Sequence, residues 1–420
     1  MQYAFKDKHS TVMCSLVLKE TIRYYMNNES DVYGCFIDAT KAFDRVRYDK
    51  LFTLLIKRGL PPIVLRALLD MYQRQQMRTI WKGESSRLFS TSNGIRQGGV
   101  ISPVLFCVYM DELLRTLESK GHGCWIGQHY YGGSGFADDL TLLNPSVNGM
   151  REMVKICDEF GDEYSVAYNP TKTVCVLFSK KKKKKTPDIS LNGVKLKWVD
   201  SVKHLGNYID SDLRERTEIR RKRSDLVGRV NSMVISLGNS RDEIIRKVFN
   251  SQCAHFYGAQ AWCYEDNCVH DFQTMWNRCV RRIFKLPYMT HTRFLPHLLG
   301  ICSAMDQIYC RFLNMIKGMR ESANRRVRYI TRLAEANPRS IIGSNLRLIA
   351  RKVNVDLNNI VEMGQVQLKF SYINNCTDED TITLDFINEL RDSMSYRCDL
   401  NIEGFSQNEI HDIFEHICTN

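Results

Sequence analysis

The spacing of apolar residues divides the chain into a mixed first half and a helical second half. Apolar positions three or four residues apart predict helices, and short apolar runs bounded by turn residues predict strands. The predicted helices of the first half span residues 10–26, 48–58, 61–75, a segment opened by Ser102 as N-cap and Pro103, and 150–164. The predicted strands are residues 32–37, two strand ends within 136–143, and 174–178. This mixture predicts an α+β sheet with helices on one face.

After Asp210 the pattern becomes helical. The predicted helices are residues 213–237, 241–262 and 269–285, and the chain beyond Gly300 stays mostly helical. The longest apolar run, residues 104–110, is far too short to span a bilayer, so no membrane partner is expected.

Charge is distributed unevenly along the chain, whose formal net charge is +12. Residues 180–229 hold 16 basic and 7 acidic side chains, whereas residues 376–420 hold 2 basic and 11 acidic ones. A basic surface favours a polyanionic partner such as nucleic acid, because contacts to phosphates release condensed counterions. The six lysines 180–185 fit a nuclear address, a contact to the nucleic-acid backbone or a solvated loop equally well.

The 15 cysteines are an odd number with scattered spacing, and the first residues carry no apolar secretory core. We therefore expect reduced thiols in an intracellular protein of the nucleus or the cytoplasm. Cys263, Cys268 and His270 lie close together, but they lack the paired spacing of a structural zinc site, as do His411, His416 and Cys418.

Three aspartates suggest phosphoryl-transfer chemistry. Asp38 ends a predicted strand, and Asp138 and Asp139 lie in a predicted hairpin turn. Such transfer uses two divalent cations about 3.5–4 Å apart, and Mg²⁺ prefers carboxylate oxygens. Turns favour Asp on their own, so the pair by itself is weak evidence for a metal site.

Five segments give the aspartates a context. They are residues 36–46 (FIDATKAFDRV), 93–103 (NGIRQGGVISP), 136–143 (FADDLTLL), 169–173 (NPTKT) and 204–209 (HLGNYI). In this order they resemble the palm motifs of reverse transcriptases, specifically the non-LTR, LINE-type enzymes of the jockey group. Residues 257–262, 276–287 and 290–292 resemble the region downstream of the palm in those elements.

The resemblance implies a right-hand polymerase with a ferredoxin-like palm sheet. Its expected regions are a finger remnant at residues 1–30, the palm at 31–210, a helical thumb at 211–300, and a C-terminal, mostly helical region at 301–420. The opening segment resembles the last part of the fingers. We therefore expect the earlier finger strands to lie outside this chain, and the chain alone to bind primer–template but extend it poorly.

The resemblance also implies a role for each motif residue. Asp38, Asp138 and Asp139 would hold two Mg²⁺ ions, for which Mn²⁺ could substitute, and Lys172 would act as a general acid. The residues expected around the incoming nucleotide are Ala39, through its carbonyl, Phe43, as a gate against the 2′-hydroxyl, and Gln97 and Gly98. Leu205 and Gly206 would form the primer grip. Asp44 is expected to be structural, in a salt bridge to a basic neighbour.

The resulting hypothesis is an RNA-directed DNA polymerase that joins dNTPs to a DNA primer on an RNA template. No particular oligomeric state is indicated. An RNA-dependent RNA polymerase would usually carry Gly before the Asp pair and a polar residue at the sugar gate, where this chain has Ala137 and Phe43. The other alternative is a catalytically impaired retroelement relic that only binds nucleic acid.

Overall fold

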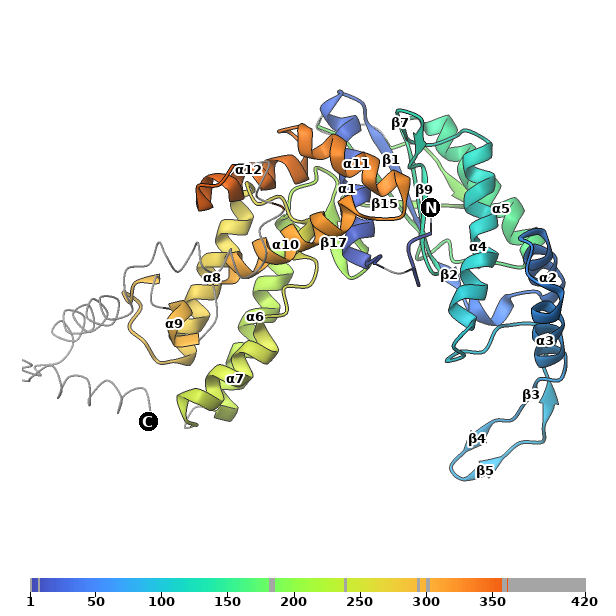
Figure 1. The fold of residues 1–420 in the computed structure, drawn as a ribbon, viewed down its shortest axis with the longest axis horizontal. Helices are drawn as coiled ribbons and strands as arrows, with labels where there is room; N and C mark the ends of the chain where they lie inside the picture. The colour runs from blue at the N-terminus through green and yellow to red at the C-terminus, as the bar shows by residue number, and fades with distance from the viewer. Residues whose placement is uncertain are drawn as a thin grey trace, which may run out of the picture. The chain divides into compact units, whose positions relative to one another are not determined.

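The computed structural model describes residues 2–6, 8–180, 186–237, 240–292, 295–299, 303–356 and 361 (Figure 1). The chain divides into two compact units. The first comprises Met1–Leu205 and Ser211–Leu213, and the second comprises Gly206–Asp210 and the chain from Arg214 onward. Of the six-lysine run, residues 181–185 lie outside the described residues.

A five-stranded sheet organises the first unit, with strand order β15-β12-β1-β10-β9. The central strand pairs antiparallel with both of its neighbours, β10 and β12. The bounds are β1 Val32–Ile37, β9 Gly133–Phe136, β10 Asp139–Asn144, β12 Val174–Phe178 and β15 Lys197–Trp198. The predicted strands at residues 32–37 and 174–178 are therefore confirmed with the same bounds. An uninterrupted apolar run of this length leaves little freedom in where a strand begins and ends.

Helices cover both faces of this sheet, and the prediction of helices on one face is wrong (Figure 1). Helix α1, Thr11–Asn27, contacts β1, while α4, Ser102–Ser119, and α5, Val147–Tyr164, pack with the opposite face. The physical reason lies in β1, which is apolar at successive positions. Alternate residues of a strand point to opposite faces, so such a strand needs cover on both.

The remaining elements of the first unit are shorter. They are α2 Tyr48–Lys57, α3 Pro62–Gln73, the short η1 Phe43–Arg45, β2 Ala39–Thr40, β7 Trp125–Ile126, β8 His129–Tyr130, β11 Ala167–Tyr168, β13 Ser190–Leu191, β14 Val194–Lys195 and β16 Ser201–His204, besides the strands of residues 76–90. The Ser10 side chain caps α1 by accepting from Met13 N–H. Ser102 instead is the first residue of α4 and makes no capping bond, so its predicted role as N-cap is wrong.

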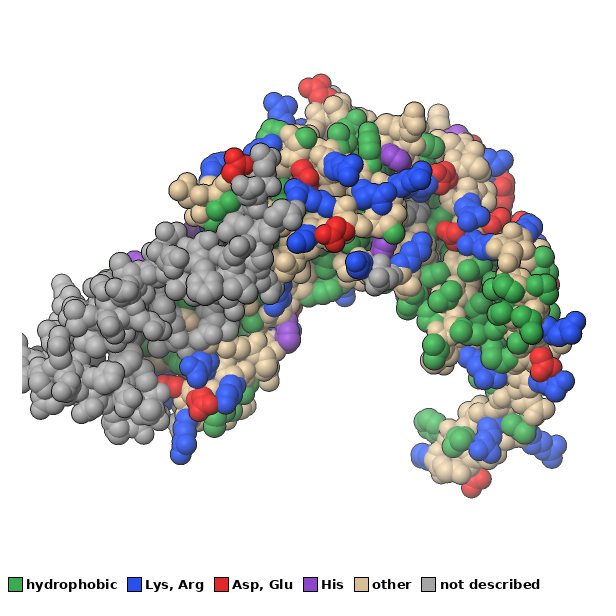
Figure 2. Space-filling model, viewed as in Figure 1, with side chains coloured by type: hydrophobic (Ala, Val, Ile, Leu, Met, Phe, Trp, Pro, Cys, Tyr) green, Lys and Arg blue, Asp and Glu red, His purple; other side chains and the backbone are tan. Residues whose placement is uncertain are grey.

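Residues 76–90 form a protruding arm. Its strands are β3 Gln76–Met77, β4 Ile80–Trp81, β5 Glu84–Ser85 and β6 Phe89–Ser90, paired β3 with β6 and β4 with β5. Every residue of the arm is exposed, including Trp81 at 73%. Figure 2 shows apolar and basic side chains side by side on it. An exposed mixture of aromatic and basic side chains is typical of surfaces that bind single-stranded nucleic acid.

The second unit is helical. Its elements are β17 Asn207–Asp210, α6 Arg216–Leu237, α7 Asp242–Cys253, the short η2 Ala259–Ala261, α8 Asn267–Ile283, α9 Leu295–Leu299, α10 Ala304–Arg320, α11 Arg325–Ala336 and α12 Ile341–Val353. Helix α6 packs along α8, and α10 contacts α8 and η2. Among the described residues, no helix is long and apolar enough to cross a membrane.

The predicted helix over residues 241–262 ends nine residues early, at Cys253. Gly258 has φ +83°, a conformation that a helix cannot contain. The break lets Phe256 and Trp262 both enter the core, where they pack against Trp276 and Phe272 respectively. Helical spacing alone could not reveal this, because the aromatic residues continue the apolar pattern.

Candidate active site

The three predicted catalytic aspartates meet at one end of the central sheet. Asp38 directly follows β1, and Asp139 is the first residue of β10. The register pairs Ile37 with Leu140, so Asp38 and Asp139 occupy the next opposed positions on the two strands. Cα atoms of opposed residues in antiparallel strands lie about 4.5–5.5 Å apart. The third aspartate, Asp138, precedes Asp139 in the turn between β9 and β10.

These carboxylates concentrate negative charge at one end of the sheet. Among the described residues, none of the three takes part in an ion pair. Burial raises the pKa of Asp139 to about 6, and repulsion from Asp138 and Asp38 adds to the increase. The residue still reaches solvent, so the carboxyl group is desolvated without being sealed from a ligand.

The donor set fits divalent cations. Carboxylates that repel one another and lack a cationic partner are stabilised by a bound positive ion. The described residues contain no group of three or more His, Cys, Asp or Glu side chains already arranged to hold a metal. Mg²⁺ suits such an open arrangement, because it keeps several waters and takes further oxygens from the phosphates of a substrate.

The end of the first motif packs tightly against the start of the second. Gly94 N–H donates to the Val46 carbonyl at 2.8 Å, and Ile95 N–H donates to the Phe43 carbonyl at 2.9 Å. A Cβ on Gly94, which has φ +84°, would lie 2.8 Å from the Asp44 carbonyl oxygen. Only glycine permits this close approach, so the two motifs are fixed relative to each other.

The predicted nucleotide-binding residues lie on this pair of segments. Gln97 is exposed, and its Nε2 donates to Asp44 Oδ1 at 3.1 Å. The expectation of a salt bridge for Asp44 is therefore wrong: a neutral amide holds its carboxylate. Gly98 has φ +84° and open space around its Cβ position. Glycine is therefore favoured there by the backbone conformation and not by a lack of space for a side chain.

Phe43 lies between core and surface. Its ring stacks on the buried Phe106 ring, with centroids 4.4 Å apart and planes 15° from parallel. The side chain is half-buried, so one part packs against the core and another stays accessible. The ring therefore packs against the core, and its contact with a substrate stays a prediction.

The fourth motif is joined to Asp38 through the backbone. Asn169 N–H donates to the Asp38 carbonyl at 2.8 Å, and Asp38 N–H donates to Thr173 Oγ1 at 3.3 Å. Neighbouring Ala39 pairs with Tyr168 between β2 and β11. The Asn169 side chain closes the turn by accepting from Thr171 N–H at 3.0 Å. Lys172 is exposed on this turn, so a flexible ammonium group is tethered to the strand end that carries Asp38.

The predicted primer grip is a tight turn. Leu205 has φ +46° and Gly206 has φ +79°. Two consecutive positive φ values between short strands are typical of a type I′ turn. The boundary between the two compact units falls between these residues.

Sequence reasoning missed two buried residues of the site. His204 is 5% exposed, its ring lies 5.5 Å from that of Phe36, and burial lowers its pKa to about 4. Thr173 is fully buried and holds Asp38 N–H. Both lie inside quoted motifs, but neither residue type signals a packing role by itself.

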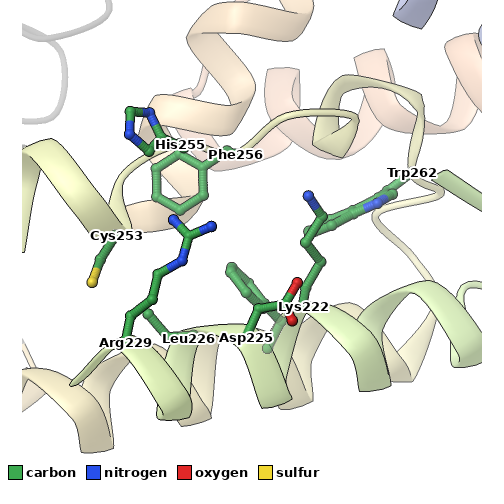
Figure 3. Close-up of a pocket in the computed structure, with 9 residues that line it drawn as sticks. Lys222, Asp225, Leu226, Arg229, Cys253, His255, Phe256 and Trp262 are labelled. Atoms are coloured by element: carbon green, nitrogen blue, oxygen red, sulfur yellow. The ribbon is translucent and has the colours of Figure 1, made fainter. Parts of the chain in front are cut away.

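The second unit contains a recess lined by basic and aromatic side chains. Figure 3 shows Lys222 and Arg229 of α6 near Phe256 and Trp262. Lys222 Nζ lies 5.7 Å from the Tyr257 ring centroid, and burial lowers its pKa. The rings of Phe256 and Trp262 are buried, so a nucleic acid would be contacted here through its phosphates by the cationic side chains, which makes this recess a candidate backbone-contact surface.

Comparison with known proteins agrees with the motifs. Residues 1–209 match the family described as Reverse transcriptase (RNA-dependent DNA polymerase). The chain is 23% identical over 325 residues to the RNA-directed DNA polymerase from mobile element jockey of Drosophila melanogaster, covering 73% of this chain and 34% of the relative. It is 23% identical over 362 residues to the probable RNA-directed DNA polymerase from transposon X-element of the same species, covering 81% and 38%.

A third relative matches a shorter part of the chain. The Pol polyprotein from the type-1 retrotransposable element R2 of Nasonia vitripennis is 29% identical over 155 residues, which is 36% of this chain and 15% of the relative. A telomerase structure from Candida tropicalis aligns with 79% of this chain and 57% of its own at 11% identity and a TM-score of 0.38. The assignment rests on the sequence relatives, of which the first two are covered to about a third of their length. Residues 1–209 therefore belong to the reverse transcriptase family, in its non-LTR retrotransposon branch.

Proposed function

We propose that this chain catalyses RNA-templated addition of dNTPs to the 3′-hydroxyl of a DNA primer. The observation that carries the proposal is the cluster of Asp38, Asp138 and Asp139 at one sheet end. They are without a cationic partner among the described residues, and the pKa of Asp139 is raised to about 6. A site that only stabilised the fold would be expected to neutralise such a cluster internally.

Each predicted site residue has a separate role in the proposed reaction. The three carboxylates would hold two Mg²⁺ ions, with Mn²⁺ as a possible substitute, and the ions would supply charge stabilisation at the transferred phosphate. The Ala39 carbonyl, Gln97 and the Gly98 backbone would orient the nucleotide, and Phe43 would exclude its 2′-hydroxyl. Lys172 would protonate the leaving pyrophosphate.

Template and primer would be held mainly by basic surfaces. The recess on α6 supports this with Lys222 and Arg229 beside aromatic rings, and the exposed arm supports it with Trp81 among basic residues. The turn at Leu205 and Gly206 would place the primer end. Regions 31–210 and 211–300 would act as palm and thumb, and no role is proposed for region 301–420. The eleven cysteines of the described residues are all free thiols, which supports an intracellular location.

Primer extension on an RNA template tests the proposal directly. Asp138→Asn should abolish Mg²⁺-dependent extension and leave primer–template binding unchanged, because binding rests on the basic surfaces. Asp162→Asn is the matched control: the same substitution at an exposed position of α5 that is not among the predicted site residues. Extension by Asp138→Asn at the control rate would refute the assignment. Primer–template binding with extension no greater than that of Asp138→Asn by the unsubstituted chain would instead favour the relic that only binds nucleic acid.

A further inference from the structure

The side chain of Gln2 is buried against the catalytic turn, although 135 residues separate it from Ala137. It is only 2% exposed. Its Oε1 accepts from Ala137 N–H at 3.1 Å and from Ala4 N–H at 3.1 Å. Its Nε2 donates to the Ala137 carbonyl at 3.5 Å, a long bond. Both polar groups of the Ala137 backbone therefore face a single carboxamide.

Backbone contacts hold Gln2 in place beside β9. Gln2 forms a parallel bridge with Gly135, and Tyr3 N–H donates to the Gly135 carbonyl at 2.9 Å. A Cβ on Gly135 would approach Gln2 Nε2 to 3.2 Å, so the glycine leaves room for the carboxamide. The segment before α1 is thus attached to the strand that leads into the turn.

The turn itself needs support. Phe136 pairs with Asp139, which leaves Ala137 and Asp138 as its two loop residues. Ala137 has φ +57°, a left-handed conformation that residues with a side chain rarely adopt. Such a conformation persists only where surrounding contacts hold it. The peptide groups on either side of Ala137 set the directions of the two aspartates after it.

We propose that Gln2 is a positioning residue for the catalytic pair, holding both peptide groups of Ala137 so that the carboxylates of Asp138 and Asp139 point to the metal site. The inference deepens the proposed function and rests on it. The choice of side chain agrees with this role. A neutral carboxamide supplies one acceptor and one donor without adding charge beside three carboxylates, whereas a carboxylate would supply no donor and a fourth negative charge.

The test compares two variants of Gln2 with a matched control in the full chain. Gln2→Met has similar length and no strong hydrogen-bonding group. Gln2→Glu keeps an acceptor for Ala137 N–H and loses the donor to its carbonyl. The control is Asn144→Ala at the other end of β10, where the carboxamide oxygen accepts from Ser146 N–H at 2.8 Å. It removes a comparable buried carboxamide, 3% exposed, far along the strand from the aspartates.

Hydrogen exchange tests the contact between Gln2 and Ala137, called the clamp below, without requiring enzymatic activity. Gln2→Met should speed exchange at the Ala137 amide by about tenfold or more, because the amide loses its acceptor, and Gln2→Glu should leave it protected. Asn144→Ala should not affect this amide. Unchanged exchange in Gln2→Met would overturn the proposal. If Gln2→Met does not fold, the test rests on a folded Gln2→Glu whose Ala137 amide is protected. Loss of primer extension in Gln2→Glu supports the role of the Nε2 donor, and extension at the wild-type rate overturns it.

Metal dependence connects the clamp to catalysis. Gln2→Met should raise the Mg²⁺ concentration for half-maximal extension and lower kcat by about 10- to 100-fold, while KM for primer–template stays unchanged. The Mn²⁺-induced rise in melting temperature should shrink as well. A uniform loss of stability with wild-type metal dependence would make Gln2 merely structural. Exchange at the Ala137 amide could be faster in Gln2→Met although the wild-type chain neither binds Mn²⁺ nor extends a primer. That result would refute the proposed function and the catalytic role of Gln2 together.

Discussion

Ionised Asp139 should destabilise the metal-free fold, so replacing it should stabilise the protein. Its pKa is about 6 in the folded chain against an ordinary 3.8. Between these values the folded chain binds more protons than the unfolded chain, and stability falls as pH rises through this window. Above pH 6 the full destabilisation is present. Asp139→Asn removes the titrating group and should raise the melting temperature at pH 7.5 but change it little near pH 4.

The size of the effect can be calculated from the shift. The difference between a pKa of about 6 and the ordinary 3.8 corresponds to about 3 kcal/mol at most. Because the residue reaches solvent, screening reduces this figure to about 1–1.5 kcal/mol. For a domain of this size such a change corresponds to roughly 2–5 °C in melting temperature. Part of the shift comes from Asp138 and Asp38, so Asp138→Asn should give a smaller rise of the same sign.

Thermal melts from pH 4 to pH 8 in chelator, repeated with Mg²⁺ or Mn²⁺, provide the assay. In the unsubstituted chain, divalent cations should stabilise the fold more at pH 7.5 than at pH 5, because protons compete for the same oxygens. Asp139→Asn should lose most of this stabilisation. Asp162→Asn corrects for the change in net charge. A metal-free melting temperature of Asp139→Asn at pH 7.5 no higher than that of Asp162→Asn would refute the reasoning.

Three further predictions concern the surroundings of the carboxylates. Phe43→Ala should increase ribonucleotide incorporation relative to dNTPs by opening space at the sugar; unchanged discrimination would leave Phe43 only its stacking role on Phe106. Lys172→Gln should lower kcat about 100-fold with little change in melting temperature, because the side chain is exposed, and a wild-type rate would exclude it as the acid. Replacing Lys222 and Arg229 together by Gln should reduce the log–log salt slope of primer–template binding by about 1.4–1.8, and an equal slope would mean that neither contacts a phosphate.

Local sequence determined two strands of the central sheet and the positions of the three aspartates along the chain. The apolar runs at residues 32–37 and 174–178 defined β1 and β12, because a buried strand of that length allows few alternatives. Asp38 and the Asp138–Asp139 pair stood at the ends of predicted strands and lie there in the structure. Their roles, and the regions assigned as fingers, palm and thumb, came from the motif resemblance and stay predictions.

Tertiary structure decided what depends on contacts between distant residues. The break after Cys253 arises because Phe256 and Trp262 both reach one core, which helical periodicity cannot encode. The Asp44 carboxylate meets Gln97 rather than a basic residue because two loops fold onto each other. Gln2 acquires a role only because its segment returns to β9 and meets a strained Ala137. Periodicity and motif spacing report the environment of each residue along its own element, whereas these contacts depend on how separate elements pack.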